Sequence, residues 1–319
     1  MIEPPKAREF SFGHEVLLAG LLVALLAAAG WLEPKFITLD TQVSLAADLW
    51  EPALVALAMT FIIITAGIDL SVASAMALAA VVLGLALERG ASPWTAAATA
   101  VAAGAALGAL NGVFVAYVRV HPLIVTLATY SAYRGVAEGI SFGRSISGFP
   151  ADFKCLGQGA VAGVPAPAIV FAAAALAAAI FLGRTTIGRA IYAIGHNEAA
   201  ARFSGIAVGR IKLLLYTLSG LAAGAAAVMH VARFDTAKAD AGEGMELDVI
   251  TAVVLGGTSI FGGRGRIIGT VLGVILIHET RKFVSWRWQN AELILIVVGA
   301  LLILSVLANT LLSRRQRQR

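Results

Sequence analysis

The stretch "APAIVFAAAALAAAIFLGR" (166–184) decides the fold, because it holds no charged side chain before its final arginine. A second stretch of the same kind, "LLLYTLSGLAAGAAAVMHVA" (213–232), follows after a polar interval. About 20 consecutive, mostly apolar residues are the length that an α-helix needs to cross the hydrocarbon core of a bilayer. Both stretches therefore predict membrane-spanning helices.

The composition extends this prediction to the whole chain. Of the 319 residues, 59% are hydrophobic and 13% are charged, whereas a soluble domain carries about 25% charged residues. The apolar runs lack the short alternation of barrel strands. We therefore predict an all-α, polytopic transmembrane bundle of about ten spanning segments, and no fewer than about eight, with broken helices among them. The predicted spans are 16–32, 52–67, 70–87, 94–118, 121–140, 165–183, 213–232, 248–262, 266–280 and 291–308.

No linker divides the chain into separate soluble domains. We expect a short N-terminal segment (1–15), one transmembrane domain (16–308) and a basic tail (309–319). If every predicted span crosses, more Lys and Arg residues fall on the side of both termini and of 184–212 than on the other side. Because such residues concentrate in cytoplasmic loops, we expect both termini and 184–212 to be cytoplasmic, and we read the net charge of +5 as orientation rather than nucleic-acid binding.

We expect the polar interval "AIGHNEAAARFSGIAVGRIK" (193–212) to contact a partner outside the membrane. It has the pattern of a short amphipathic helix that starts after an N-cap and stops at a glycine. Asn197 is the expected N-cap, and Gly205 is the expected end of the helix. Glu198 and Arg202 are spaced to pair at i,i+4, and the exposed apolar side chains would be Ala199, Ala200 and Phe203. A docking helix is the interpretation we favour, and a solvated loop that only turns the chain is the alternative.

Glycines recur at intervals of four in several predicted spans. Gly104, Gly108 and Gly112 share one helix face, and Gly269 and Gly273 repeat the spacing. Such faces let two helix backbones approach closely in lipid. We expect helix packing at these positions, with a pore-lining role as the alternative.

Polar side chains at membrane depth are the other unusual feature. Asp69 lies where two apolar segments meet, and Asn111 lies beside the glycine face. A carboxylate at this depth marks a functional or tightly paired position, or the N-cap of the next helix. Arg134 and Glu138 are four residues apart, which predicts an ion pair on one helix face.

Enzyme signatures are absent from the sequence. No Gly-x-x-x-x-Gly-Lys-Ser/Thr loop for ATP occurs, and "HETRK" (278–282) has Lys282 where a zinc-protease helix needs its second histidine. The histidines show no ligand spacing, and Cys155 is the single cysteine. We therefore expect no enzyme activity, no metal and no cofactor on this chain, so that any energy source lies on a partner or in the membrane.

Four blocks carry a family resemblance: "GIDLS" (67–71), "NGVFVAYVRVHPLIVTLAT" (111–129), "GRAIYAIGHNEAAARFSGI" (188–206) and "ELDVITAVVLGGTSIFGGRGRIIGT" (246–270). In this order they resemble the ribose/xylose-type permeases of bacterial ABC sugar importers, with details similar to the rhamnose or autoinducer branch. Glu198-Ala199-Ala200 followed by Gly205 resembles the "EAA" loop that docks on the ATPase subunit, although one extra residue separates the two elements.

The resemblance implies an inner-membrane permease subunit that moves a monosaccharide of the pentose or 6-deoxyhexose class. Its implied partners are an ABC ATPase that carries ATP and Mg, a periplasmic sugar-binding protein, a second permease copy or paralogue, and membrane lipid. Asp69, Asn111, Thr126 and Thr258 are then candidates to line the translocation path. A secondary transporter of a small polar solute is the alternative function, followed by an intramembrane enzyme.

Overall fold

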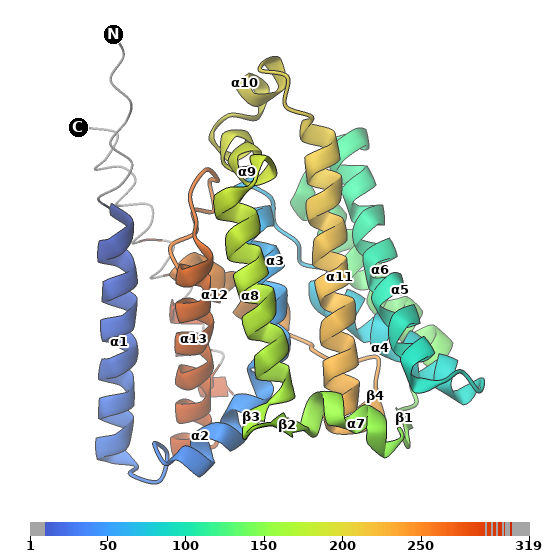
Figure 1. The fold of residues 1–319 in the computed structure, drawn as a ribbon, viewed down its shortest axis with the longest axis vertical. Helices are drawn as coiled ribbons and strands as arrows, with labels where there is room; N and C mark the ends of the chain where they lie inside the picture. Colours follow the sequence, from blue (N-terminus) through green and yellow to red (C-terminus); the bar gives the residue numbers. More distant parts are fainter. Residues whose placement is uncertain are drawn as a thin grey trace.

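The computed structural model describes residues 10–290 together with 292–294, 296–297, 299–301, 303 and 307. These residues form an all-α bundle with two very small sheets (Figure 1). The long helices are α1 (Phe10–Leu32), α3 (Trp50–Ile64), α4 (Val72–Glu88), α5 (Pro93–Val113), α6 (Pro122–Ser141), α8 (Ala166–Arg184), α11 (Val208–Phe234) and α13 (Ile267–Trp288). The shorter ones are α2 (Leu39–Leu45), η1 (Ala46–Asp48), η2 (Phe114–Val118), α7 (Ala151–Gln158), α9 (Thr186–His196), α10 (Glu198–Phe203) and α12 (Met245–Leu255).

Most of the short elements lie at the two ends of the bundle, whereas α12 packs against α13 and α3 within it. One end, which we call the α10 end, carries α9 and α10 (Figure 1). The opposite α7 end carries α2, α7 and two short strand pairs. Strands β1 (Ile146–Ser147) and β4 (Thr236–Ala237) pair antiparallel there, as do β2 (Ala160–Val161) and β3 (Val164–Pro165). The membrane-crossing part therefore lies between two polar ends.

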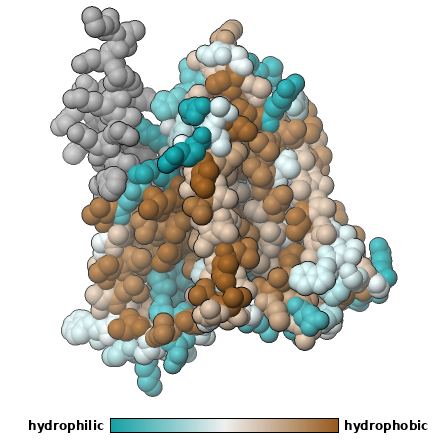
Figure 2. Space-filling model, in the orientation of Figure 1, coloured by the Kyte–Doolittle hydropathy of each residue, from teal (hydrophilic) through white to brown (hydrophobic). Residues whose placement is uncertain are grey.

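Four helices of the described residues are long and apolar enough to cross a membrane: His14–Leu32, Pro93–Val118, Ala166–Arg184 and Val208–Phe234. A fifth span results if Leu39–Asp48 and Trp50–Ile64, which meet at a bend of 56°, are counted as one. Apolar residues cover most of the face seen in Figure 2, and polar residues concentrate toward its ends. The chain is a multi-pass membrane protein built from helices.

Some predicted boundaries are wrong. The predicted span 248–262 is helical only as far as Leu255, where Gly256 caps α12 and Gly257 takes a φ of +90° that favours glycine. Residues 256–266 then form a non-helical segment before α13. At the other end, α1 begins at Phe10, inside the predicted polar segment 1–15. Residues 1–9, the tail 309–319 and most of the predicted span 291–308 lie outside the described residues.

The glycine faces lie at the closest helix contacts. A Cβ added at Gly104 would be 2.3 Å from the Gly220 carbonyl oxygen, and one at Gly108 would be 2.2 Å from that of Tyr216, so α5 and α11 touch backbone to backbone. The contact at Gly112 is looser, since an added Cβ would be 3.0 Å from the Leu213 side chain and 3.1 Å from its backbone. In the second pair of helices, Gly269 faces Gly256 and Gly273 faces Ala252, which joins α12 to α13. Small residues at these positions permit the short interaxial distances of membrane bundles.

Candidate functional site

The short helix α10 connects α9 to α11 at the α10 end (Figure 1). Asn197 caps it, because its side-chain oxygen accepts a hydrogen bond from the Ala200 N–H at 3.0 Å. After Ser204 the chain turns at Gly205, whose φ of +83° lies in the region where side chains with a Cβ are strained. The start and the stop of α10 thus follow the sequence pattern.

Glu198 holds α10 against the helix that follows it. One carboxylate oxygen accepts from Arg202 at 2.9 Å within α10, and the other accepts from Lys212 of α11 at 2.6 Å. Partial burial raises the pKa of Glu198, but the hydrogen bonds and charges of Lys212 and Arg202 outweigh it and hold the pKa below its usual value. The carboxylate is therefore ionised at neutral pH and ties α10 to α11.

The two faces of α10 differ in exposure. Ala201 is buried with Ile194 and Val208 in a small apolar cluster between α9 and α11. On the other face Ala199 and Ala200 are exposed, and Phe203 is 94% exposed. A large apolar side chain left in solvent on an anchored helix marks a surface that a partner can cover.

A second site lies inside the bundle, at the break between α3 and α4. Asp69 is buried, and one of its oxygens accepts from the Ser71 N–H at 3.0 Å and from the Ser71 hydroxyl at 2.7 Å. Its other oxygen accepts from the Ser219 hydroxyl of α11 at 2.9 Å. The backbone bond to Ser71 precedes the first turn of α4, so Asp69 stabilises the start of that helix while also pairing across the bundle.

The network continues through α5 and α6. The Asn111 amide donates to the Ser71 hydroxyl at 2.8 Å, and the Tyr133 hydroxyl lies 3.2 Å from the Asn111 carbonyl oxygen. Thr126 donates to the backbone carbonyl of Ile68 at 3.2 Å. Next to these groups, the buried Tyr216 hydroxyl makes no hydrogen bond with any residue that the structure describes. Four helices therefore meet at one polar centre in the bundle.

The structure brings three of the four predicted path residues together. Asp69, Asn111 and Thr126 surround the break, whereas Thr258 lies on the segment 256–266, where it packs beside Gly265. All four are buried. The sequence did not single out Ser219 and Tyr216 as members of the network, although each is a polar residue inside an apolar run; Tyr133 stood out in the sequence as a hydroxyl suited to a polyhydroxylated solute.

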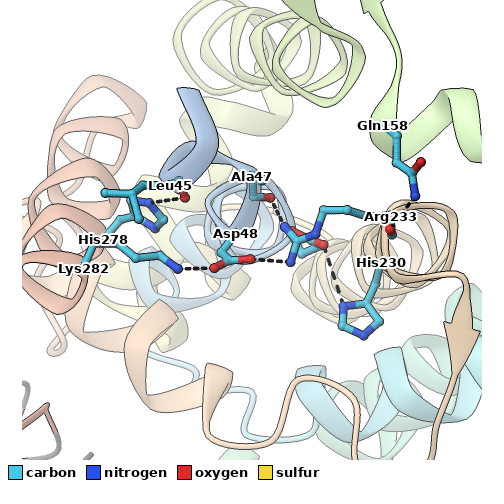
Figure 3. Close-up of polar contacts among 9 residues, drawn as sticks. Leu45, Ala47, Asp48, Gln158, His230, Arg233, His278 and Lys282 are labelled. Atoms are coloured by element: carbon cyan, nitrogen blue, oxygen red, sulfur yellow. Dashed lines mark hydrogen bonds and ion pairs between the residues drawn. The ribbon is translucent and has the colours of Figure 1, made fainter. Parts of the chain in front are cut away.

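A third group of polar residues lies at the α7 end (Figure 3). Arg233 of α11 donates to the Ala47 carbonyl, to Asp48 at 2.5 Å and to Glu51 at 3.3 Å, and Asp48 also accepts from Lys282 of α13. His230 lies 3.7 Å from the second Glu51 oxygen. These residues line one side of a cavity of about 400 Å³ between α3, α11, α12 and α13.

The predicted ion pair of Arg134 with Glu138 is wrong. Arg134 instead donates to the backbone carbonyls of Ala239 and Ala241, the latter at 3.3 Å, and Glu138 is exposed. The segment that follows β4 brings two carbonyl groups to the guanidinium, and these acceptors replace the carboxylate one helical turn away. No spacing rule within α6 could have predicted this contact.

Apolar spanning helices around a buried polar centre, with an anchored but exposed helix at one end, define a polytopic membrane protein of the transport type. The chain belongs to the family described as "branched-chain amino acid transport system / permease component", whose model matches residues 43–306.

Curated relatives agree with this assignment. The chain is 39% identical over 292 residues to the ribose import permease protein RbsC of Escherichia coli (strain K12), covering 90% of this chain and 91% of the relative. It is 37% identical over 278 residues to the ribose import permease protein RbsC of Bacillus subtilis (strain 168), covering 86% of each. It is also 33% identical over 312 residues to the autoinducer 2 import system permease protein LsrD of E. coli (strain K12), covering 96% and 94%. No solved structure matches the chain.

Proposed function

We propose that this chain is the transmembrane subunit of an ABC importer that moves a monosaccharide of the pentose or 6-deoxyhexose class across the bacterial inner membrane. The observation that carries the proposal is α10, a capped and anchored helix that leaves Phe203 94% exposed. The sequence has no phosphate-binding loop of its own, so a separate ATPase subunit would supply ATP, Mg and the energy. The relatives named for ribose and autoinducer 2 support the substrate class.

The proposed topology has ten crossing segments with both termini in the cytoplasm. In support, the Phe10 end of α1 lies at the same end of the bundle as α9 and α10 (Figure 1). Several exposed arginines also lie in the segments of this end: Arg184, Arg189, Arg202, Arg210, Arg264 and Arg266. Cytoplasmic enrichment of Lys and Arg then assigns the α10 end to the cytoplasm. The segments 1–15, 184–212 and 309–319 would all be cytoplasmic.

The α7 end would face the periplasm and receive the sugar-binding protein. Asp240 and Glu243, which follow β4, are exposed and support the stretch 239–248 as a docking surface, whereas Glu246 is buried and Asp248 pairs with Arg281. The outer faces of α5 and α6 expose large apolar residues, including Leu110 and Leu127, which suits contact with lipid or with a second permease copy.

Transport would follow from movement of α10. When the ATPase subunits close, they would push on the exposed face of α10, and the Glu198–Lys212 pair would pass the displacement to α11. Because Ser219 of α11 holds Asp69, a tilt of α11 would open the polar centre, and such rigid-body motion is a common route to alternating access. Asp69, Asn111, Thr126 and Thr258 would line the path in the open state.

The test is co-purification of an ATPase from cells that express the chain with its neighbouring genes. The informative variant is Phe203→Asp, because the wild-type side chain is almost fully exposed and its loss leaves the bundle intact. The matched control is Phe142→Asp at the other end, where Phe142 is 88% exposed. We expect the ATPase to elute with the wild type and the control and to be lost from Phe203→Asp. Gly205→Arg, which strains the turn after α10, should behave like Phe203→Asp.

A secondary transporter is the competing function. It requires no nucleotide-binding partner, and it leaves the exposed face of α10 without a role. If no ATPase elutes with the wild type, or if Phe203→Asp retains it as well as the control does, the importer proposal is wrong and the secondary transporter is favoured.

A further inference from the structure

The segment 256–266, "GGTSIFGGRGR", lies between α12 and α13 at the α10 end, beside α9 (Figure 1). It closes on itself through backbone hydrogen bonds from Ser259 N–H to the Arg264 carbonyl at 3.0 Å and from Gly262 N–H to the Ser259 carbonyl at 2.9 Å. Positive φ angles at Gly262 and Gly263 make this compact turn possible. The segment is therefore an ordered turn with a defined shape.

The segment is fixed to α9 and to the end of α3. Gly263 N–H donates to the Ile64 carbonyl at 2.8 Å, and the Tyr192 hydroxyl donates to the Gly265 carbonyl at 2.7 Å. At Gly195 there is no room for a side chain, since an added Cβ would be 1.8 Å from the Ile64 oxygen and 2.3 Å from Gly263 N. Backbone atoms of three elements thus touch at one point.

A third link joins the segment to α1. His14 lies with its Nε2 2.9 Å from the Leu255 carbonyl, and Glu15 pairs with Arg266 at 3.0 Å. Because α9 continues through Asn197 into α10, the segment and α10 belong to one connected unit at this end of the bundle. Motion of either part must be shared with the last residue of α3, which directly precedes the break at Asp69.

At the tip of this clamped segment, Phe261 is 62% exposed. Together with Phe203 of α10 it gives the connected unit two exposed phenylalanines. Side chains that are held in place before binding lose little conformational freedom on association, which favours affinity. Because the segment is linked to α9, which continues into α10, Phe261 lies on the same connected unit as Phe203, and this continuity favours the partner of α10 as its partner.

We propose that 256–266 is a second contact for the ATPase subunit, with Phe261 as its apolar anchor. The inference rests on the proposed function, because it takes the ATPase that docks on α10 as the occupant. Movement of the ATPase would then act on the permease at two places. Displacement of α10 is passed to α11, and displacement of 256–266 is passed to the end of α3 through the hydrogen bond from Gly263 to Ile64. The displacement then reaches the polar centre at Asp69 both from α11 and from the end of α3.

Site-directed photo-cross-linking tests the contact. The single Cys155 is exposed, and Cys155→Ser gives a background in which a benzophenone maleimide labels one introduced cysteine at a time. The positions compared are Phe261→Cys, Phe203→Cys as the α10 reference and Phe142→Cys as the control at the opposite end. Each labelled permease is purified in complex with its ATPase, irradiated, and analysed by mass spectrometry; gel filtration confirms that each variant folds.

We expect an ATPase adduct at Phe203→Cys and at Phe261→Cys, and none at Phe142→Cys. An adduct at Phe203→Cys alone, or lipid adducts alone at Phe261→Cys, overturns the second contact and leaves the proposed function standing. If the ATPase co-purifies but forms no adduct at either α10-end position, the docking surfaces on α10 and on 256–266 are both wrong. If no ATPase co-purifies with any labelled permease, the proposed function is overturned as well. An ATPase adduct at Phe142→Cys contradicts the assignment of the two ends and overturns both.

Discussion

Replacing Gly195 with alanine is the change that strains the clamp between α9, α3 and 256–266 most directly. The added Cβ would lie 1.8 Å from the Ile64 carbonyl oxygen, whereas ordinary contact begins at 3.4 Å, so the two groups must separate by 1.6 Å. Overpacking of this kind costs about 1–3 kcal/mol. Loss of the Gly263 N–H bond to the Ile64 carbonyl adds about 1 kcal/mol.

At roughly 2–4 °C per kcal/mol for a chain of this kind, the thermal midpoint in detergent should fall by at least about 4 °C. Sugar-dependent stimulation of the ATPase should fall as well, because α9 no longer moves together with the end of α3. The matched control is Gly183→Ala in α8, where a Cβ meets nothing within 4 Å. If Gly195→Ala and Gly183→Ala have the same thermal midpoint and the same sugar-dependent stimulation of the ATPase, the proposed close contact between α9, α3 and 256–266 is wrong.

The other predictions concern the bundle and the acid–base behaviour of α10. Gly220→Ala places a Cβ 2.1 Å from a carbonyl oxygen of α5 and should lower the thermal midpoint in detergent, whereas Gly139→Ala, with open space around it, should not; equal midpoints would contradict the α5–α11 contact. Asp69→Ala leaves three buried donor groups without their acceptor and should destabilise the bundle by about 3 kcal/mol in a denaturation titration. Because the pair with Lys212 holds the pKa of Glu198 below its usual 4.5, its stabilisation is present above pH 4.5 and is lost as the pH falls through the lowered value. The protection factors of the α10 amides, which correct hydrogen exchange for its intrinsic dependence on pH, should therefore be unchanged between pH 7 and 4.5 and fall below that in the wild type, with no such fall in Glu198→Gln.

Local features were predictable from the sequence. The long apolar helices follow from composition, since a run such as 166–184 has few stable options outside a membrane. The cap at Asn197 and the turn at Gly205 each depend only on residues a few positions away in the chain, so the local sequence is enough to predict them. The glycine intervals likewise indicated which helix faces pack closely.

Contacts between distant segments were not predictable. Ser219 meets Asp69 across 150 residues, and Arg233 meets Asp48 across 185, so no spacing pattern records either pair. The break after α12 was expected among the broken helices, because paired glycines at 256–257 and 262–263 interrupt the run, but the predicted span ran on to 262 instead of ending at Leu255. In each case the tertiary arrangement decides which of several possible partners a polar group meets.

Solute uptake in proteoliposomes that contain the permease, its ATPase and the binding protein tests the central claim most directly. We expect a labelled pentose to accumulate only when ATP is supplied on the side of α10, and we expect Phe203→Asp to abolish this accumulation. Accumulation driven by an ion gradient without ATP, or full ATP-driven uptake by Phe203→Asp, would contradict the account.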